Sequence, residues 1–318
     1  MRPLIALAAP MGEAVEAKLA ERYELVGPLK PPLEGSLAAL PKEALDRIRA
    51  VLSIGMVPIT ERHIARLPSL GLIACLGSGY EGVDVGAARK RGIMVTHGRD
   101  ANAASVADLA IGLMIESVRQ LPAARARLYA GQWQGNVSSR SIPMKGLTGR
   151  KLGIYGLGAI GQRIALRAKA LEMDVGYHNR RPRADVSYPY FGTLHELASW
   201  CDVLTISVRA DATNRHAINA KILEAIGADG HLINVARGSV VDQQALCAAL
   251  RDRTIAGAGL DVFEDEPHVP AELLELPNVA LTPHIGGNTA QSRKAMETLL
   301  LANVDAFFAG LGAVTPVP

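Results

Sequence analysis

Cysteine is scarce in this sequence, which has three among 318 residues: Cys75, Cys201 and Cys247. They form no C-x-x-C pair and have no histidine at metal-ligand spacing, so the pattern excludes a disulfide framework and a structural metal site. An odd number of widely separated thiols is typical of a reducing compartment. We therefore expect a cytoplasmic protein without a bound metal.

Long apolar runs are also missing. No run approaches the roughly 18 apolar residues that a membrane-spanning helix needs, so we expect no membrane association. The first ten residues hold one basic side chain and a short apolar run, as a signal peptide would. Pro10 interrupts that run and the amphipathic stretch Glu13–Ala20 follows it, so we predict a buried first strand there instead.

The excess of positive charge is small, because 34 basic residues face 31 acidic ones and the formal net charge is +3. The basic residues are dispersed apart from short clusters such as Arg89–Arg91 and Arg180–Arg181. A nucleic-acid-binding protein usually concentrates its basic residues on one face or helix. We therefore expect no nucleic-acid partner.

What the sequence does have is a repeated alternation of short apolar runs with helical stretches, which is typical of parallel sheets covered on both faces. A chain of this length exceeds what one core usually organises. We therefore predict an α/β protein with two doubly wound parallel-sheet domains. The expected strands are Leu4–Ala9, Ala50–Ile54, Leu72–Leu76 and Ile93–Thr96 in a first set, and Leu152–Tyr155, Val175–His178, Val203–Ser207, Leu232–Asn234, Ile255–Gly259 and Val279–Leu281 in a second.

Three further segments complete the outline. The stretch Ala103–Arg119 is apolar nearly all round, which predicts a helix buried on several sides between domains or subunits. The segment Ala130–Leu147 is rich in glycine and serine and is expected to be irregular. A final helix is predicted over Thr289–Phe308.

The motif G-x-G-x-x-G occurs once in a context that gives it meaning, as Gly156-Leu157-Gly158-Ala159-Ile160-Gly161. It follows the apolar run Lys151–Tyr155 and begins a helical stretch. The first glycine permits a tight turn, the second lets the backbone approach a pyrophosphate, and the third lets the helix pack on the strand. The helix N-terminus then offers free N–H groups to the phosphates. The pattern predicts a dinucleotide site, although a glycine-rich turn can also arise by chance.

The end of the next strand distinguishes the two nicotinamide cofactors, because a carboxylate there binds the ribose 2′-hydroxyl and repels a 2′-phosphate. This chain has no acid in His178-Asn179-Arg180-Arg181-Pro182. Adjacent arginines form a strong anion site, so we expect NADP(H) to be preferred. NAD(H) stays possible if the arginines are solvated and Asn179 contacts an ordinary ribose.

Three later segments each place a chemically capable residue after a predicted strand: Asn234–Gly238, Asp261–Pro267 and Pro283–Gly287. Together with the glycine turn and the segment Leu76–Asp84, they resemble the D-isomer-specific 2-hydroxyacid dehydrogenases. The resemblance covers nearly the whole chain in the family's order, and it is strongest to the NADP-dependent glyoxylate/hydroxypyruvate reductase branch.

The resemblance implies a flavodoxin-like substrate domain built from residues 1–98 and 285–318, and a Rossmann cofactor domain over residues 99–284. It assigns the family's catalytic residues to Arg237, Glu266 and His284. It also implies a homodimer built around the long helix that begins at Ala103.

The resemblance assigns further contacts to both ligands. Substrate carboxylate would be bound by the backbone of Ser78 and Gly79, and the nicotinamide carboxamide by Asp261. The remaining expected cofactor contacts are Val106, Val208, Val235, Ala236 and Gly286.

The chemistry of these side chains fits the reduction of a 2-keto acid to a 2-hydroxy acid. Histidine titrates near neutral pH, so His284 is the natural proton donor to the carbonyl oxygen. Glu266 would orient His284 and favour its charged form, and Arg237 can bind the carboxylate and the carbonyl oxygen together.

Each assignment has an alternative: Arg237 as a surface ion-pair partner, Glu266 as one of several loop acids, and His284 as a core histidine. The other seven histidines, including His97, His178, His195 and His268, are expected to be structural or solvent-facing. Glu264 and Asp265 are expected to be solvated loop charges.

Substrate preference is less determined. The loop Ser53–Val57, with small Gly55 and flexible Met56, suits either a short or a bulky 2-keto acid. Glyoxylate or hydroxypyruvate reduction is the main hypothesis and aryl-pyruvate reduction the alternative. A dinucleotide-sensing, corepressor-like binding protein is the alternative from another class, because such proteins can keep the same residues.

The segment Ser207–Asp211 departs from the family, which often has histidine and proline there. Arg209 could add to a 2′-phosphate site or could be exposed. Ser78 replaces a frequent valine, but a backbone contact would survive that change.

Overall fold

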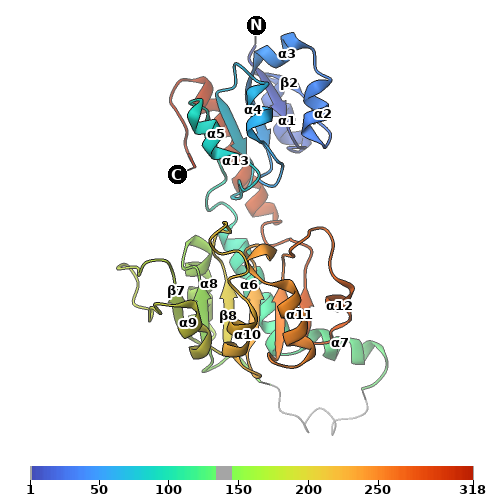
Figure 1. Cartoon of the computed structure of the whole chain (residues 1–318), viewed down its shortest axis with the longest axis vertical. Coiled ribbons are helices and arrows are strands. Elements are labelled where there is room, and N and C mark those ends of the chain that lie inside the picture. Colours follow the sequence, from blue (N-terminus) through green and yellow to red (C-terminus); the bar gives the residue numbers. More distant parts are fainter. Residues whose placement is uncertain (1, 134–144, 318) are drawn as a thin grey trace. The chain divides into compact units, whose positions relative to one another are not determined.

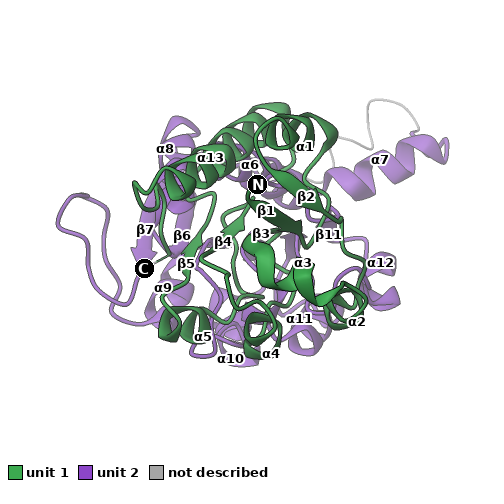
Figure 2. Cartoon of the chain, turned by 90° about the horizontal axis from the view of Figure 1, so that it is seen from above, with its two compact units in different colours: residues 1–102, 288–318 green, residues 103–287 purple. Residues whose placement is uncertain are grey.

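The computed structural model describes residues 2–133 and 145–317, so most of the segment expected to be irregular, residues 134–144, lies outside the described residues. The chain forms two compact units (Figure 2). Unit 1 contains residues 1–102 and 288–318, and unit 2 contains residues 103–287.

Unit 1 is built on a five-stranded parallel sheet whose order is β2-β1-β3-β4-β5. Figure 1 labels the edge strand β2, and Figure 2 labels all of these strands. This is the strand order of flavodoxin-like folds. The strands are β1 (Leu4–Leu7), β2 (Glu24–Val26), β3 (Ile48–Ser53), β4 (Leu72–Cys75) and β5 (Met94–Thr96). The sequence analysis missed β2, because this three-residue edge strand is only partly buried and has no apolar run.

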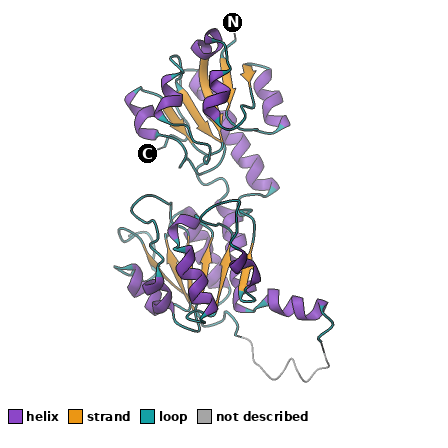
Figure 3. Ribbon diagram, turned by 45° about the vertical axis from the view of Figure 1, so that its right-hand side comes forward, coloured by secondary structure: helices purple, strands orange, loops and turns teal. Residues whose placement is uncertain are grey.

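Successive residues of these strands face two separate cores. Ile5, Leu52 and Leu72 pack against one set of helices, and their neighbours Leu4, Val51 and Ile73 pack against another. Strand side chains alternate between the two faces of a sheet, so both faces are covered by helices (Figure 3). On one face lie α1 (Glu13–Ala20) and α13 (Ala290–Phe308); on the other lie α2 (Leu33–Ala38), α3 (Lys42–Arg47), α4 (Glu61–Ala65) and α5 (Val85–Lys90).

Unit 2 is built on a six-stranded parallel sheet with the order β11-β10-β9-β8-β6-β7. The strands are β6 (Lys151–Tyr155), β7 (Asp174–His178), β8 (Val203–Ile206), β9 (His231–Asn234), β10 (Gly257–Leu260) and β11 (Val279–Leu281). A parallel bridge joins Tyr177 of β7 to Tyr190, which lies outside the strands given above. If that bridge is counted as the third strand, the order from this edge begins 3-2-1-4-5-6, which is the Rossmann order.

The helices of unit 2 also cover both faces of its sheet. α6 (Ala103–Val118) and α8 (Ala159–Ala170) share one core, and α9 (Leu194–Trp200), α10 (Ala220–Ile226) and α11 (Gln243–Arg251) share the other. The unit is completed by α7 (Leu121–Tyr129), the 3₁₀ turn η1 (Gly238–Val240) and α12 (Ala271–Glu275). The fold class predicted from the sequence is confirmed.

Among the described residues, no helix is both long and apolar enough to cross a membrane. The chain crosses between the units after Asn102 and after Gly287. The assignment of one unit to substrate and the other to cofactor remains a prediction.

Candidate active site

The glycine turn joins β6 to α8 at the carboxyl end of the unit 2 sheet. Gly156 has φ +102°, and a Cβ there would lie 2.7 Å from the Val208 backbone nitrogen. A Cβ on Gly161 would lie 2.2 Å from the Gly156 carbonyl oxygen. Gly158, at the N-terminus of α8, has open space where its side chain would be. Each glycine therefore has the property that the motif assigns to it: a tight turn, close helix packing and an open approach for a ligand.

A cavity of about 770 Å³ opens in front of this turn. It contains four arginines, Arg180, Arg181, Arg183 and Arg209. The sequence analysis assigned the first two to a phosphate site and named Arg209 as either an addition to that site or an exposed side chain. The cavity lining includes, beside these arginines, Tyr155, Gly156, Leu157, Gly158, Asn179, Ser207, Val208, Asp211, Thr213 and Asn214. Arg180 and Arg181 are exposed, as side chains that receive an outside anion must be.

The remaining charges of the cavity are partly committed to the protein. Arg183 pairs with Asp185 at 2.5 Å and donates to the Leu157 carbonyl oxygen at 2.9 Å. Partial burial lowers the pKa of the Arg209 guanidinium; the charge of Asp211 opposes this shift and that of Arg237 adds to it. Hydrogen bonds from Thr213 lower the pKa of Asp211. Arg180 and Arg181 thus remain the better candidates for a phosphate.

Asn179 holds the glycine turn. Its Oδ1 accepts a hydrogen bond from the Leu157 backbone N–H at 2.7 Å, and its Nδ2 group can donate to a ribose. The cavity, the open Gly158 and the positive N-terminus of α8 together fit a dinucleotide phosphate chain. The exposed arginines fit an additional phosphate at the adenosine ribose.

Arg237 lies in the turn that follows β9. Buried Asn234 shapes this turn, because its Oδ1 accepts from the Ala236 N–H at 3.0 Å and its Nδ2 donates to the Arg237 carbonyl oxygen at 3.0 Å. The next residue, Gly238, packs against the Phe263 backbone, where a Cβ would lie 1.9 Å from the carbonyl carbon. The turn is therefore specified by Asn234 and Gly238, and Arg237 is partly exposed between them.

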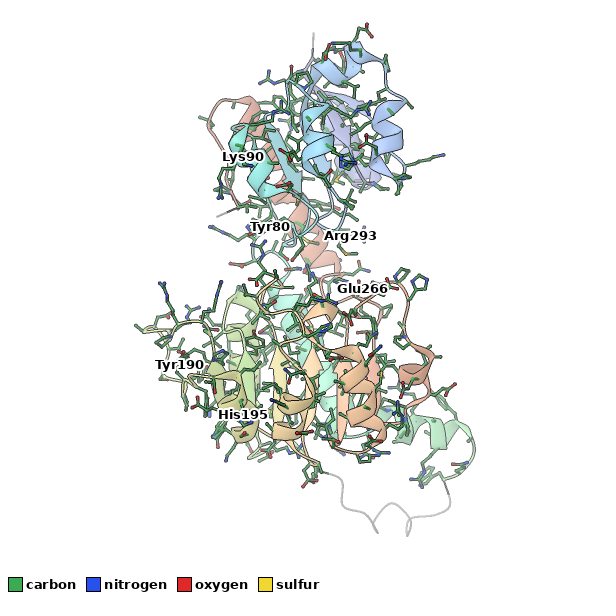
Figure 4. The ribbon with its side chains drawn as sticks, viewed as in Figure 1. Tyr80, Lys90, Tyr190, His195, Glu266 and Arg293 are labelled. Carbon is green, nitrogen blue, oxygen red and sulfur yellow. The ribbon has the colours of Figure 1, made fainter. Side chains whose placement is uncertain are left out.

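His284 and Glu266 form a pair, with the His284 Nδ1 2.7 Å from the Glu266 Oε2. The other oxygen, Oε1, accepts from the Phe263 N–H at 3.1 Å, which fixes the carboxylate; the Glu266 side chain is labelled in Figure 4. Because a carboxylate only accepts, Nδ1 must carry a hydrogen. Nε2 is then the ring atom left to transfer a proton, and the side chain is 34% exposed, unlike that of a packed core histidine.

Asp261 has a structural task that sequence reasoning did not foresee. This residue is 2% exposed, and its carboxylate accepts from the N–H groups of Ile285 and Gly286, both at 2.8 Å, and from the Thr282 hydroxyl at 2.6 Å. His284 itself has φ +52°, a left-handed conformation that is uncommon for residues other than glycine. Asp261 thus braces the loop that carries His284. Its Oδ2 accepts from the Gly286 N–H and keeps a second acceptor site for a carboxamide.

The other expected cofactor contacts are near these groups but mostly covered. Val235 and Ala236 are each 6% exposed in the turn before Arg237, and Val106 of α6 is 5% exposed. A Cβ on Gly286 would lie 2.9 Å from the Asp261 Oδ2 and 3.5 Å from Val106. Gly286 is therefore required by packing around Asp261.

The expectation that Glu264 is a solvated loop charge was wrong. Its Oε1 accepts from Arg215 at 2.6 Å and lies 2.7 Å from the His216 Nε2, and its side chain is 25% exposed. Asp265, at 86% exposure, is solvated as expected. Within the described ranges no group of three or more acidic, histidine or cysteine side chains is arranged to hold a metal.

In unit 1, the segments after β3 and β4 lie backbone to backbone. A Cβ on Gly55 would lie 1.9 Å from the Gly79 carbonyl oxygen, and one on Gly82 would lie 2.5 Å from the Val57 carbonyl oxygen. Glycine is therefore required at position 55 because the Gly79 backbone packs against it, and the expectation that Gly55 makes room for a substrate is replaced by this packing role. Met56 is 56% exposed.

Comparison with known proteins identifies one matching family model and similar proteins that cover nearly the whole chain. Residues 111–286 match the family model "D-isomer specific 2-hydroxyacid dehydrogenase, NAD binding domain". Glyoxylate/hydroxypyruvate reductase A of Arabidopsis thaliana is 36% identical over 97% of this chain and 96% of its own length. Hydroxyphenylpyruvate reductase of Plectranthus scutellarioides is 35% identical over the same shares of each chain.

Among solved structures, the NADPH-dependent glyoxylate/hydroxypyruvate reductase of Sinorhizobium meliloti, in complex with NADP and malonate, is similar over 100% of this chain and 97% of its own. It superimposes with a TM-score of 0.89 at 39% identity.

Proposed function

This chain belongs to the D-isomer-specific 2-hydroxyacid dehydrogenases, and from that membership we propose that it reduces a short 2-keto acid, glyoxylate or hydroxypyruvate, with NADPH. The observation that carries the proposal is the His284–Glu266 pair at 2.7 Å in the same unit as the glycine turn and Arg237. The full-length similarity to reductases of these two acids supports the substrate class.

Each predicted site residue has a separate role in the proposed reduction. NADPH supplies hydride to the carbonyl carbon when it is bound. His284, with its Nδ1 hydrogen held by Glu266, gives a proton from Nε2 to the carbonyl oxygen. Arg237 binds the carboxylate and the carbonyl oxygen and so orients the substrate plane. The backbone N–H groups of Ser78 and Gly79 bind the other carboxylate oxygen. The products are a D-2-hydroxy acid and the oxidised cofactor.

The preference for NADPH rests on the exposed Arg180 and Arg181 in the 770 Å³ cavity. The relative from Sinorhizobium meliloti, whose structure holds NADP, supports the same preference. Binding of NADH remains possible, because a ribose without the phosphate would lose only the arginine contacts.

Two further proposals concern the assembly and its location. α7 has no buried residue, and Leu128, Tyr129 and Trp133 are 53%, 80% and 67% exposed. Exposed large apolar side chains in one segment are typical of a protein interface, so we propose a homodimer that uses α6 and α7. Three free, buried cysteines support a cytoplasmic, reducing location.

A substrate panel tests the function. Oxidation of NADPH and of NADH is followed with glyoxylate, hydroxypyruvate and phenylpyruvate. We expect the highest kcat/KM with NADPH and one of the two short acids. A preference for phenylpyruvate would favour the aryl-pyruvate alternative, which the Plectranthus relative supports. Tight NADPH binding without turnover of any 2-keto acid would favour the dinucleotide sensor.

A further inference from the structure

The backbone of residues 77–79, here called the carboxylate loop, is held from one side at two consecutive carbonyl groups. The Gly98 N–H donates to the Gly77 carbonyl oxygen at 2.6 Å. The His97 Nδ1 lies 2.9 Å from the Ser78 carbonyl oxygen. Both donors come from the segment after β5, which neighbours β4 in the sheet.

Holding these carbonyls determines where the neighbouring N–H groups point. The Gly77 carbonyl shares a peptide group with the Ser78 N–H, and the Ser78 carbonyl shares one with the Gly79 N–H. Neither peptide is among the cis bonds of the chain, and in a planar trans peptide the C=O and N–H point in opposite directions. Both N–H groups therefore point away from His97 and Gly98. No protein atom among the described residues accepts a hydrogen bond from either one.

The hydrogen bond from His97 has only one possible direction. A carbonyl oxygen accepts and cannot donate, so the His97 Nδ1 carries the hydrogen. The ring makes an edge contact with Tyr80, with the centroids 5.1 Å apart; Tyr80 is labelled in Figure 4.

The main chain of His97 is held in turn by the C-terminal segment. The Thr315 hydroxyl donates to the His97 carbonyl oxygen at 2.6 Å, and the His97 N–H donates to the Thr315 carbonyl oxygen at 3.2 Å. Buried Asn303 of α13 donates from Nδ2 to the Thr315 hydroxyl at 2.9 Å and accepts the Thr315 N–H at 3.0 Å. His97 is thus fixed by residues more than 200 positions away in the sequence.

We propose that His97 is a positioning residue that aims the Gly79 N–H at the substrate carboxylate by binding the Ser78 carbonyl from behind. The inference rests on the proposed function, because it needs a carboxylate as the group bound by the loop. Successive backbone N–H groups that point to one side form a site for anions. Without the His97 hydrogen bond, the Ser78–Gly79 peptide could rotate, and the carboxylate would lose a preorganised donor.

The test compares two variants of nearly equal size. In His97→Asn, the carboxamide can place a donor close to the position of Nδ1, whereas His97→Leu has no donor. Both lose the ring and its contact with Tyr80, so their difference isolates the hydrogen bond. We expect His97→Leu to raise the KM for the 2-keto acid about tenfold, which is the loss of one well-made hydrogen bond. The kcat and the NADPH dissociation constant should change less than threefold, and His97→Asn should restore a KM near that of the wild type.

A second histidine of unit 1 provides the control. His63 is 8% exposed and its Nδ1 accepts from the Thr60 N–H at 3.1 Å, away from the carboxylate loop. His63→Leu should lower the thermal unfolding temperature without a change in KM. An equal rise of KM in His97→Leu and His97→Asn, or no rise in either, would overturn the proposal.

Failure of the proposed function can be distinguished from failure of this inference. If the wild-type protein turns over no 2-keto acid, the function is wrong, and binding of malonate in the presence of NADPH tests His97 alone. His97→Leu should lower the affinity for malonate about tenfold, and an unchanged affinity would overturn the inference. If His97→Leu does not fold, Thr315→Val decides: a measurable rise in KM supports the proposal, and an unchanged KM overturns it.

Discussion

The two units use the carboxyl ends of their parallel sheets in opposite ways. In unit 2 this edge presents polar side chains: Arg180 and Arg181 after β7, Arg237 after β9, and His284 with its partner Glu266. In unit 1 the corresponding edge presents backbone N–H groups of Ser78 and Gly79, and the neighbouring segments hold this backbone through Gly55 and His97.

This difference determines which substitutions each unit tolerates. A site made of side chains fails when a side chain is removed, and its framework can stay intact. A site made of backbone has no side chain to remove, so it fails when a neighbour is enlarged or a supporting hydrogen bond is lost. The four predictions below test this contrast, from the largest expected effect to the smallest.

Removal of the His284 side chain should have the largest effect. We expect His284→Ala to lower kcat about 10³-fold, because general acid catalysis contributes roughly 10²–10⁴-fold. NADPH affinity and the thermal unfolding temperature should stay close to those of the wild type. Steady-state kinetics and cofactor titration measure this, and a loss of NADPH affinity would show that His284 is structural.

Enlargement of Gly98 should damage the backbone site of unit 1. A Cβ there would lie 2.7 Å from the Leu76 carbonyl oxygen and 2.9 Å from the Gly77 carbonyl carbon, so Gly98→Ala must displace the carboxylate loop. Displacements of about 1 Å can cost about 10²-fold in rate, and we expect kcat/KM to fall by that amount while NADPH binding persists. Gly35→Ala in α2, where a Cβ meets nothing within 4 Å, is the control. Unchanged kcat/KM in Gly98→Ala would contradict the contrast between the units.

The stability of unit 2 should depend on pH and should decrease in acid. Burial lowers the pKa of His231 to about 4, and the charges of Arg150 and Lys145 add to the shift; its Nδ1 lies 2.8 Å from the Ser117 hydroxyl. The unfolded chain takes up this proton near the ordinary pKa of 6.5, whereas the folded chain takes it up only near 4. Unfolding therefore becomes easier as the pH falls through this range.

Between about pH 7 and about pH 5, this linkage should lower the free energy of unfolding by about 2 kcal/mol. Urea unfolding of the wild type and of His231→Gln at both pH values measures it. The variant should lose most of the dependence, and an equal dependence in both proteins would refute the assignment.

The smallest effect is expected at the cofactor cavity. Arg180→Ala should raise the dissociation constant of NADPH about tenfold, through loss of a charged hydrogen bond. The dissociation constant of NADH should rise less than twofold. Arg163→Ala on α8 is the control, because this exposed arginine is not part of the cavity lining. Equal weakening of NADPH and NADH binding would show that Arg180 does not bind the 2′-phosphate.

Much of the fold was predictable because parallel sheets buried on both faces leave continuous apolar runs. Leu72–Cys75 and Val203–Ile206 are fully buried strands whose runs are visible directly. β2 was missed because its three residues are only partly buried. α7 was missed because it buries no residue, so no apolar periodicity marks it.

The candidate site was predictable where a residue type alone limits the chemistry. The glycine turn and the arginine pair are recognisable from their types and from the strands that they follow, whereas the resemblance to the family assigned the roles of Arg237, Glu266 and His284. The extra arginine Arg183 lies two residues beyond Arg181, and its proximity was the available signal.

The sequence by itself determined the two α/β units and the dinucleotide turn, because each depends on local spacing along a strand or helix, and its resemblance to the family supplied the predicted catalytic residues. Only the tertiary structure decided that Asp261 braces the His284 loop, that Gly55 serves Gly79, and that Thr315 holds His97 behind the carboxylate loop. These contacts join segments distant in sequence, and a hydrogen bond between such segments leaves no periodic pattern in either one.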